Sequence, residues 1–191
     1  MRIILASNSP RRRELLEGIG LDFEIVSSNI EEISEETEPS LLVMNLSKQK
    51  ALSVAESLKD DALIIAADTA VEINGNILGK PRDKFEAYKM LKRLSGKRHS
   101  VYTGISLVSS SDLRLISDYE VTYVYIKKLN DDIIWRYINT GECFDKAGSY
   151  AIQGYGSLIV SKINGDYFNV VGLPLSKLSD MMSKNFGIEL L

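Results

Sequence analysis

The segment Arg2-Ile-Ile-Leu-Ala-Ser-Asn-Ser-Pro-Arg-Arg-Arg13 decides how this chain begins to fold. Its apolar run from Ile3 to Ala6 predicts a buried strand. Ser9 suits a helix N-cap, and Pro10 suits the first helical position because its missing N–H is not needed there. The segment therefore predicts a strand, a turn and a helix in succession.

Three arginines, Arg11, Arg12 and Arg13, follow in the first helical turn. The N-terminus of a helix carries partial positive charge, so cations are unfavourable there unless an anion binds. Free backbone N–H groups, serine hydroxyls and guanidinium groups together favour a phosphate chain as that anion. The alternative is three solvated arginines on an ordinary surface helix, and the segment alone leaves both interpretations open.

Outward from this segment, helical and strand patterns alternate early in the chain and hairpins follow in the middle. The apolar run from Ala62 to Ala67 predicts a strand buried on both faces, which ends at Asp68-Thr69 and resumes from Ala70 to Ile73. Asn74-Gly75 predicts a hairpin turn. Further helices are predicted over 39–58, 83–94, 131–137 and 175–186, and further strands over 23–26, 77–78, 100–108, 113–126 and 158–163. The pattern predicts an α/β fold with a mixed sheet flanked by helices.

Composition limits the class of protein. The chain has 191 residues and a net charge of −3, which suits one domain, or two lobes sharing a core, with no global attraction to nucleic acid. A single cysteine, Cys143, excludes an intramolecular disulfide, and with one histidine it excludes the usual Cys/His zinc site. No apolar run approaches the ~20 residues of a membrane span, and the N-terminus does not resemble a signal peptide. We therefore expect a cytoplasmic protein with neither nucleic-acid nor membrane partners.

Three side chains are candidates for chemistry. Asp68, at the expected end of an apolar strand, could ligate a hard cation or accept a proton from water; alternatively it caps a turn. Lys80 stands between a glycine and a proline, which favours a positioned lysine over a plain loop residue without deciding it. Lys50 lies among apolar residues of its helix and is either functional or a buried stem with a solvated ammonium. His99 is predicted to be structural and Cys143 inert.

A later segment, Asp145-Lys-Ala-Gly-Ser-Tyr-Ala-Ile-Gln-Gly154, is rich in special residues. Tyr150 offers a flat apolar surface, and the Gln153 amide can pair with the edge of a nucleobase. The alternative is a tight loop with a structural glutamine. Neither a P-loop nor a G-x-G-x-x-G motif is present, so the familiar nucleotide-binding loops do not apply.

Six ordered blocks resemble the Maf family of nucleoside triphosphate pyrophosphatases over nearly the whole chain. They are Ser7-Asn-Ser-Pro-Arg-Arg12, Ala67-Asp-Thr69, Ile77-Leu-Gly-Lys-Pro81, Leu94-Ser-Gly with His99, Asp145 to Gly154, and Gly165-Asp-Tyr with Asn169-Val-Val-Gly-Leu-Pro174. The resemblance implies a single domain over 1–191, two lobes with a cleft, and the Maf/inosine triphosphatase-like fold. Family members are often dimeric, which leaves a homodimer open.

The resemblance also implies an activity: a nucleoside triphosphate is hydrolysed to the monophosphate and pyrophosphate, in a house-cleaning role. It makes Asp68 the general base for a metal-activated water, with Mg²⁺ or Mn²⁺ held by Glu32 and Asp68. The residues it implies around the substrate are Ser7, Arg11, Arg12, Lys50, Lys80, Thr69 and Gln153. Tyr150 with Gln153 resembles the branch that acts on dTTP and UTP, and Arg11, Thr69 and Gln153 match the positions linked to substrate choice in that branch. A nucleotide-binding regulator of cell division without turnover is the alternative, and a nucleotidyl transferase is a second one.

Overall fold

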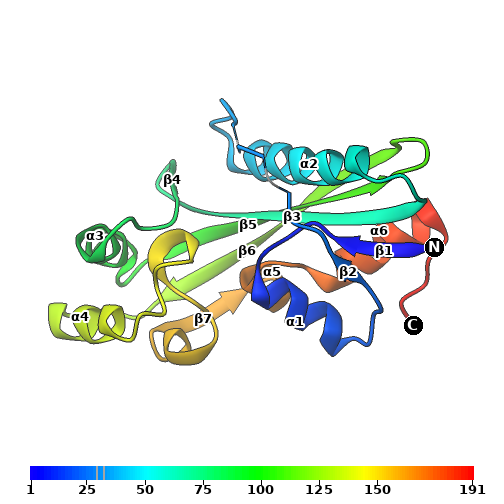
Figure 1. Cartoon of the computed structure of the whole chain (residues 1–191). Coiled ribbons are helices and arrows are strands. Elements are labelled where there is room, and N and C mark those ends of the chain that lie inside the picture. Colours follow the sequence, from blue (N-terminus) through cyan, green and yellow to red (C-terminus); the bar gives the residue numbers. More distant parts are fainter. Residues whose placement is uncertain (29, 32) are drawn as a thin grey trace. The chain divides into compact units, whose positions relative to one another are not determined.

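A seven-stranded mixed sheet organises the described part of the chain (Figure 1). The computed structural model describes residues 1–28, 30, 31 and 33–191. The sheet has the order β2-β1-β3-β5-β6-β7, and β4 pairs with β3. Both neighbours of β1 run parallel to it, whereas β4 and β7 run antiparallel to their partners, so the predicted mixed sheet is confirmed. The strands are β1 (Arg2–Leu5), β2 (Glu24–Ile25), β3 (Ala62–Ile73), β4 (Asn76–Leu78), β5 (Arg98–Ser109), β6 (Leu115–Ile126) and β7 (Val160–Asn164).

Helices begin largely where proline and aspartate predicted them. The helices are α1 (Pro10–Gly18), α2 (Pro39–Ser57), α3 (Lys84–Leu94), α4 (Asp131–Asn139), α5 (Tyr167–Val171) and α6 (Leu175–Phe186), with 3₁₀ turns η1 (Ala147–Ser149) and η2 (Gly154–Leu158). Asp83 caps α3 by accepting from the Glu86 N–H at 2.8 Å. Ser9 occupies the N-cap of α1, but its side chain makes no capping bond; instead Ser7 Oγ accepts from the Ser9 N–H.

One sequence prediction about strands was wrong, and one short helix was not predicted at all. β3 is one continuous strand of 12 residues, so Asp68 and Thr69 lie within it rather than at its end. A sheet pairs through backbone groups, so polar side chains do not by themselves interrupt a strand. The short helix α5 was not expected, because five residues are too few to show a helical repeat.

The chain divides into two compact units. The first comprises Met1–Asp68, Thr103–Glu120 and Gly172–Leu191, and the second comprises Thr69–Tyr102 and Val121–Val171. β3 passes from the first unit to the second between Asp68 and Thr69. Two units agree with the two lobes that the resemblance implies; the cleft and the single-domain assignment stay predictions.

The core of the first unit lies on both faces of β1 and β3. Ile3 and Leu5 pack on one face with residues of α1 and α6, while Ile4 and Ala6 pack on the other with residues of α2. Figure 1 accordingly shows α2 and α1 on opposite sides of these strands. The run 62–67 is fully buried, as predicted for a strand covered on both faces. α2 contacts β5 closely, since a Cβ on Gly104 would overlap the Val43 carbonyl.

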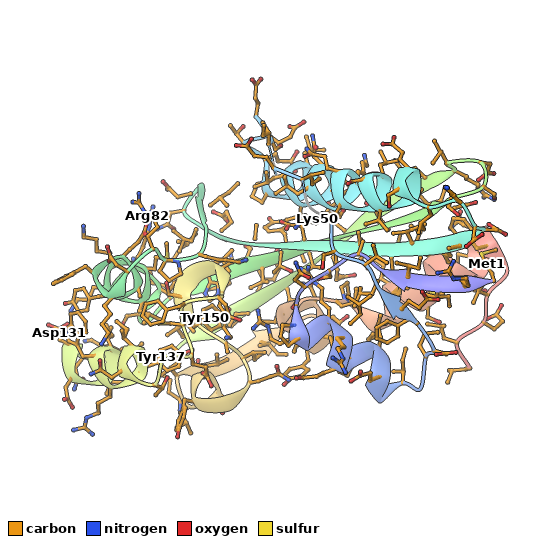
Figure 2. All side chains as sticks on the ribbon, viewed as in Figure 1. Met1, Lys50, Arg82, Asp131, Tyr137 and Tyr150 are labelled. Atoms are coloured by element: carbon orange, nitrogen blue, oxygen red, sulfur yellow. The ribbon has the colours of Figure 1, made fainter. Side chains whose placement is uncertain are left out.

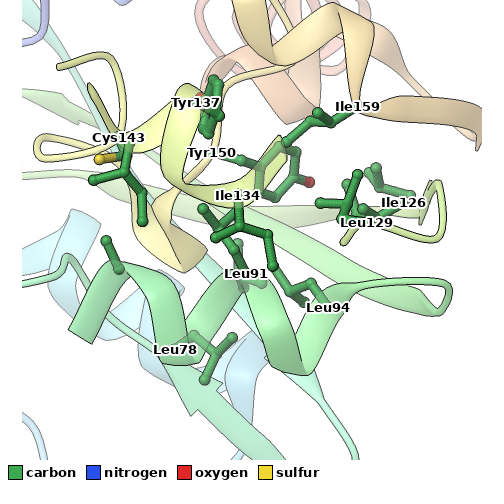
Figure 3. Close-up of a cluster of buried hydrophobic side chains, with 14 of the residues drawn as sticks. Leu78, Leu91, Leu94, Ile126, Leu129, Ile134, Tyr137, Cys143, Tyr150 and Ile159 are labelled. Carbon is green, nitrogen blue, oxygen red and sulfur yellow. The ribbon is translucent and has the colours of Figure 1, made fainter. Parts of the chain in front are cut away.

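The second unit has a separate core between its strands and the pair α3 and α4 (Figure 3). Leu91 and Leu94 of α3 meet Ile134 of α4, and Tyr150 is buried beside them. Among the described residues, no helix has the length and apolar character that crossing a membrane requires.

Candidate active site

The loop after β1 brings Ser7 and Arg12 together in the first unit. Arg12 donates from Nε to the Gly172 carbonyl at 2.8 Å and from Nη1 to Ser7 Oγ at 3.3 Å. Ser7 Oγ also accepts from the Ser9 N–H at 3.2 Å. The Arg12 guanidinium is therefore held at the N-terminal turn of α1, where the helix dipole favours an anion.

Gly172 was not among the predicted site residues, although its backbone contacts one of them. Its carbonyl accepts from Arg12, and its φ of 126° lies in the region that favours glycine. The available signal was its place in the block Asn169-Val-Val-Gly-Leu-Pro174, which carried the resemblance but received no role.

The three arginines of α1 differ in their surroundings. Arg13 forms an exposed ion pair with Glu17 one turn later, at 2.7 Å. Such surface pairs contribute little to stability, and Arg13 is an ordinary helix-surface residue. Arg11 is half-buried at the start of the helix, like Arg12. Of the three, only Arg13 therefore fits the interpretation of a solvated arginine on the helix surface.

Lys50 and Asp68 form an ion pair that is largely removed from water. Figure 2 labels Lys50 on the side of α2 that faces the sheet. Lys50 Nζ donates to Asp68 Oδ1 at 2.6 Å, and their side chains are 11% and 16% exposed. The alternative of a solvated Lys50 ammonium is therefore wrong. Removing two charges from water costs free energy, and hydrophobic residues of similar size would not have this cost. A buried ion pair therefore indicates a function more than a contribution to stability.

Packing of α2 on the sheet positions this pair. The Gly104 contact brings α2 close to β5, and Ser47, one turn before Lys50, lies 2.8 Å from Ser106 of that strand, Oγ to Oγ. Asp68 follows the section of β3 that pairs with β1, whose register matches Leu5 with Ile65. Ser7 and Asp68 therefore follow the paired ends of adjacent parallel strands, the usual edge for ligand binding in α/β sheets.

Thr69, Lys80 and Gln153 belong to the second unit. Thr69 is half-buried in β3, Lys80 is exposed after β4, and Gln153 is half-buried immediately before η2. The Gly79 carbonyl, next to Lys80, accepts from the Gly148 N–H at 3.0 Å. The Lys80 segment is thus bonded to the segment that carries Gln153.

Tyr150 does not provide the flat surface that the sequence suggested. The residue is 5% exposed in the core, and its hydroxyl lies 2.6 Å from His99 Nε2. Burial lowers the pKa of His99 to about 4, so His99 is neutral near pH 7 and structural as predicted. Cys143 is fully buried, and burial raises the pKa of its thiol, which agrees with an inert residue.

The predicted metal ligands are only partly described. Glu32 lies outside the described residues. Within the residues that the structure describes, no group of three or more His, Cys, Asp or Glu side chains is arranged to hold a metal. Asp68 is the one predicted ligand whose placement is known, and it supplies carboxylate oxygen, the donor that Mg²⁺ and Mn²⁺ prefer.

Comparison with known proteins first defines the fold class. A HAM1 protein from Coxiella burnetii matches with a TM-score of 0.58 and 18% identity, over 96% of this chain and 99% of that one. At this identity the likeness shows a shared α/β fold. The family model described as "Maf-like protein" then matches residues 2–185, and the chain belongs to the Maf family.

Curated relatives align over the full length of the chain. A protein of Thermoanaerobacter sp. (strain X514), named dTTP/UTP pyrophosphatase, is 59% identical over 191 residues and is covered completely, as is this chain. A protein of Clostridioides difficile (strain 630) with the same name is 50% identical over 191 residues, covering 100% of this chain and 98% of that protein.

Proposed function

We propose that this chain hydrolyses dTTP and UTP to the monophosphate and pyrophosphate. Its enzyme class, a hydrolase of nucleoside triphosphates, follows from membership of the Maf family and from the names of relatives at 50–59% identity. The observation that carries the proposal is the Lys50–Asp68 pair, a carboxylate and an ammonium 2.6 Å apart and mostly out of water. The cytoplasm is the proposed location.

Asp68 is the proposed general base. Water attacks the α-phosphorus, its proton passes to an Asp68 carboxylate oxygen, and the bond to the bridging oxygen of the β-phosphate breaks to release pyrophosphate. The Lys50 ammonium donates to Asp68 Oδ1 and would place its positive charge beside the phosphate under attack. Two side chains on different elements would thus align both the water and the phosphate under attack.

Cationic and hydroxyl groups are proposed to hold the phosphates. Arg12 and Ser7 are already bonded to each other at the start of α1. Arg11 is the next guanidinium on that turn, and Lys80 is a further cation that the resemblance implies. Guanidinium groups bind phosphate oxygens through paired N–H donors, so these residues would offset the charge of a triphosphate.

Mg²⁺ or Mn²⁺ is the proposed cofactor, with Asp68 and Glu32 as protein ligands. Mg²⁺ in nucleotide enzymes commonly uses one or two carboxylates and takes other oxygens from phosphates and water, so one described carboxylate fits such an ion. When bound, the ion would supply positive charge at the phosphates.

Thr69 and Gln153 are proposed to contribute to base choice. The Gln153 amide can donate and accept, as the N3–H and carbonyls of uracil and thymine require. No nucleic acid or membrane is part of the proposal, and a homodimer stays a prediction.

A pyrophosphate-release assay across a nucleotide panel tests the proposal. With Mg²⁺ or Mn²⁺ we expect dTTP and UTP to be turned over faster than purine triphosphates, with stoichiometric pyrophosphate and monophosphate. Binding of dTTP without pyrophosphate release would instead identify a nucleotide-binding regulator and refute the proposed reaction.

A further inference from the structure

The segment from Tyr150 to Gly156, which carries Gln153, is held by three side chains from outside it. Tyr137 Oη accepts from the Ala151 N–H at 3.0 Å, and the Tyr150 hydroxyl meets His99 Nε2 at 2.6 Å. On the other side of Gln153, the Glu142 carboxylate accepts from the Tyr155 and Gly156 N–H groups. All these groups belong to the second unit.

Glu142 uses both carboxylate oxygens in this contact. Oε1 accepts from Tyr155 N at 3.0 Å, and Oε2 accepts from Gly156 N at 2.9 Å. Hydrogen bonds to an ionised carboxylate are stronger than those between neutral groups. A neutral amide at this position could accept through one atom only, so the geometry specifically suits a carboxylate.

Gly154 makes room for this carboxylate. Its φ is +56°, a left-handed conformation, and a Cβ there would overlap Glu142 Oε1. A Cβ on Gly156 would likewise overlap the Ala151 carbonyl. The two glycines therefore let the backbone fold back tightly around Glu142, immediately after Gln153.

We propose that Glu142 is a positioning residue that holds Gln153 for recognition of the pyrimidine base; this inference rests on the proposed function. Backbone bonds two residues before Gln153, at Ala151, and two residues after it, at Tyr155, restrict its backbone from both sides. Restricting a binding group in advance reduces the entropy lost when the base binds. Without the carboxylate, the segment would lose the anchor that follows Gln153, at Tyr155 and Gly156.

The segment that carries Lys80 is held by a different hydrogen bond. Gly148 N donates to the Gly79 carbonyl at 3.0 Å, and a Cβ on Gly148 would lie 3.0 Å from Val71 Cγ1. Along the chain, this hydrogen bond lies before Gln153 and before the bonds at Tyr150 and Ala151. The bonds to the Glu142 carboxylate lie after Gln153, at Tyr155 and Gly156. A change at Glu142 is therefore expected to affect base recognition and to leave Lys80 in place.

Glu142→Gln tests the inference. We expect the ratio of kcat/KM for dTTP to that for dGTP to fall about tenfold, because the site loses a charge-assisted bond that orders the base-reading amide. KM for dTTP should rise while kcat changes little. Competitive inhibition by inorganic tripolyphosphate, which has no base, should stay as in the wild type. Glu142→Asp keeps the charge and should restore part of the ratio.

Asp112→Asn is the matched control. Asp112 also accepts a backbone N–H in a turn, from Arg114 at 3.1 Å, and its substitution removes the same charge elsewhere in the fold. This variant should keep the wild-type ratio. The melting temperature of each variant shows whether it is folded, and Glu142→Asp decides the question if Glu142→Gln does not fold.

Three outcomes would overturn the inference: an unchanged base ratio, an equal loss for every base, or an equal weakening of tripolyphosphate inhibition. Failure of the proposed function has a different signature, because the wild type itself would then release no pyrophosphate. In that case calorimetric Kd values for dTTP and dGTP replace kcat/KM. Equal Kd ratios in wild type and Glu142→Gln would reject the role of Glu142.

Discussion

Replacing Asp68 with Asn removes the negative charge of the Lys50–Asp68 pair and keeps the shape of the side chain. A positioned general base contributes about 10²–10⁴ in rate, so kcat for dTTP should fall at least ~100-fold. Affinity should fall far less, because the proposed phosphate-binding cations remain. The expected pattern is therefore a large loss in kcat with a small change in nucleotide Kd.

The same change should also affect folding stability. Breaking a fully buried pair by removing one partner costs about 3–5 kcal/mol. Solvent reaches 11% of the Lys50 side chain and 16% of Asp68, and Asn still offers an oxygen to Lys50 Nζ, so we expect about 1–3 kcal/mol. A double-mutant cycle with Lys50→Met, measured by urea unfolding, should give a coupling energy of similar size.

The assay follows pyrophosphate release at saturating dTTP with Mg²⁺, and calorimetry gives the nucleotide Kd. Asp60→Asn is the control, because Asp60 pairs with Arg2 at 3.3 Å on the surface and its loss should leave kcat and stability nearly unchanged. Wild-type kcat in Asp68→Asn would refute the assignment of Asp68 as general base.

Three further predictions concern the other parts of the site and the core. Arg12→Ala and Lys80→Ala should each lower kcat/KM by a similar factor for every base, because phosphates carry no base identity. Arg13→Ala is the control, since Arg13 lies on the same helix as Arg12 but pairs with Glu17. A loss confined to one base would count against a phosphate role. Gln153→Glu should lower kcat/KM for dTTP and UTP more than for guanine nucleotides, whose N1–H and N2–H₂ are donors, and equal losses would make Gln153 structural. His99 has a pKa of about 4 in the folded protein, against an ordinary value of 6.5. As the pH falls, the imidazole is therefore protonated in the unfolded chain before it is protonated in the folded protein. The free energy of unfolding should accordingly decrease by about 3 kcal/mol between pH 6.5 and about pH 4. Urea unfolding at pH 7 and pH 4.5 measures this decrease, which should be smaller in His99→Gln; an equal decrease in both proteins would show that other groups cause it.

Local signals in the sequence predicted most elements well. The Asn74-Gly75 turn joins β3 to β4, with positive φ at both residues, and α6 covers the predicted range 175–186. These features depend on backbone preferences and on periodicity within a few residues. The prediction that β3 breaks at Asp68 was wrong because local preferences do not determine where a strand continues. Its pairing with neighbouring strands does.

Motif order and side-chain type are enough to identify Asp68, Lys50 and the arginines of α1 as candidates for the chemistry. Which of these side chains contact one another depends on the tertiary structure. Arg12 bonds to the carbonyl of a residue 160 positions away, and Lys50 reaches Asp68 because α2 packs closely on β5. The anchoring of the Gln153 segment by Glu142 is likewise a tertiary feature. Such contacts depend on how elements pack and on strand register, and neither follows from the local preferences that a single sequence displays.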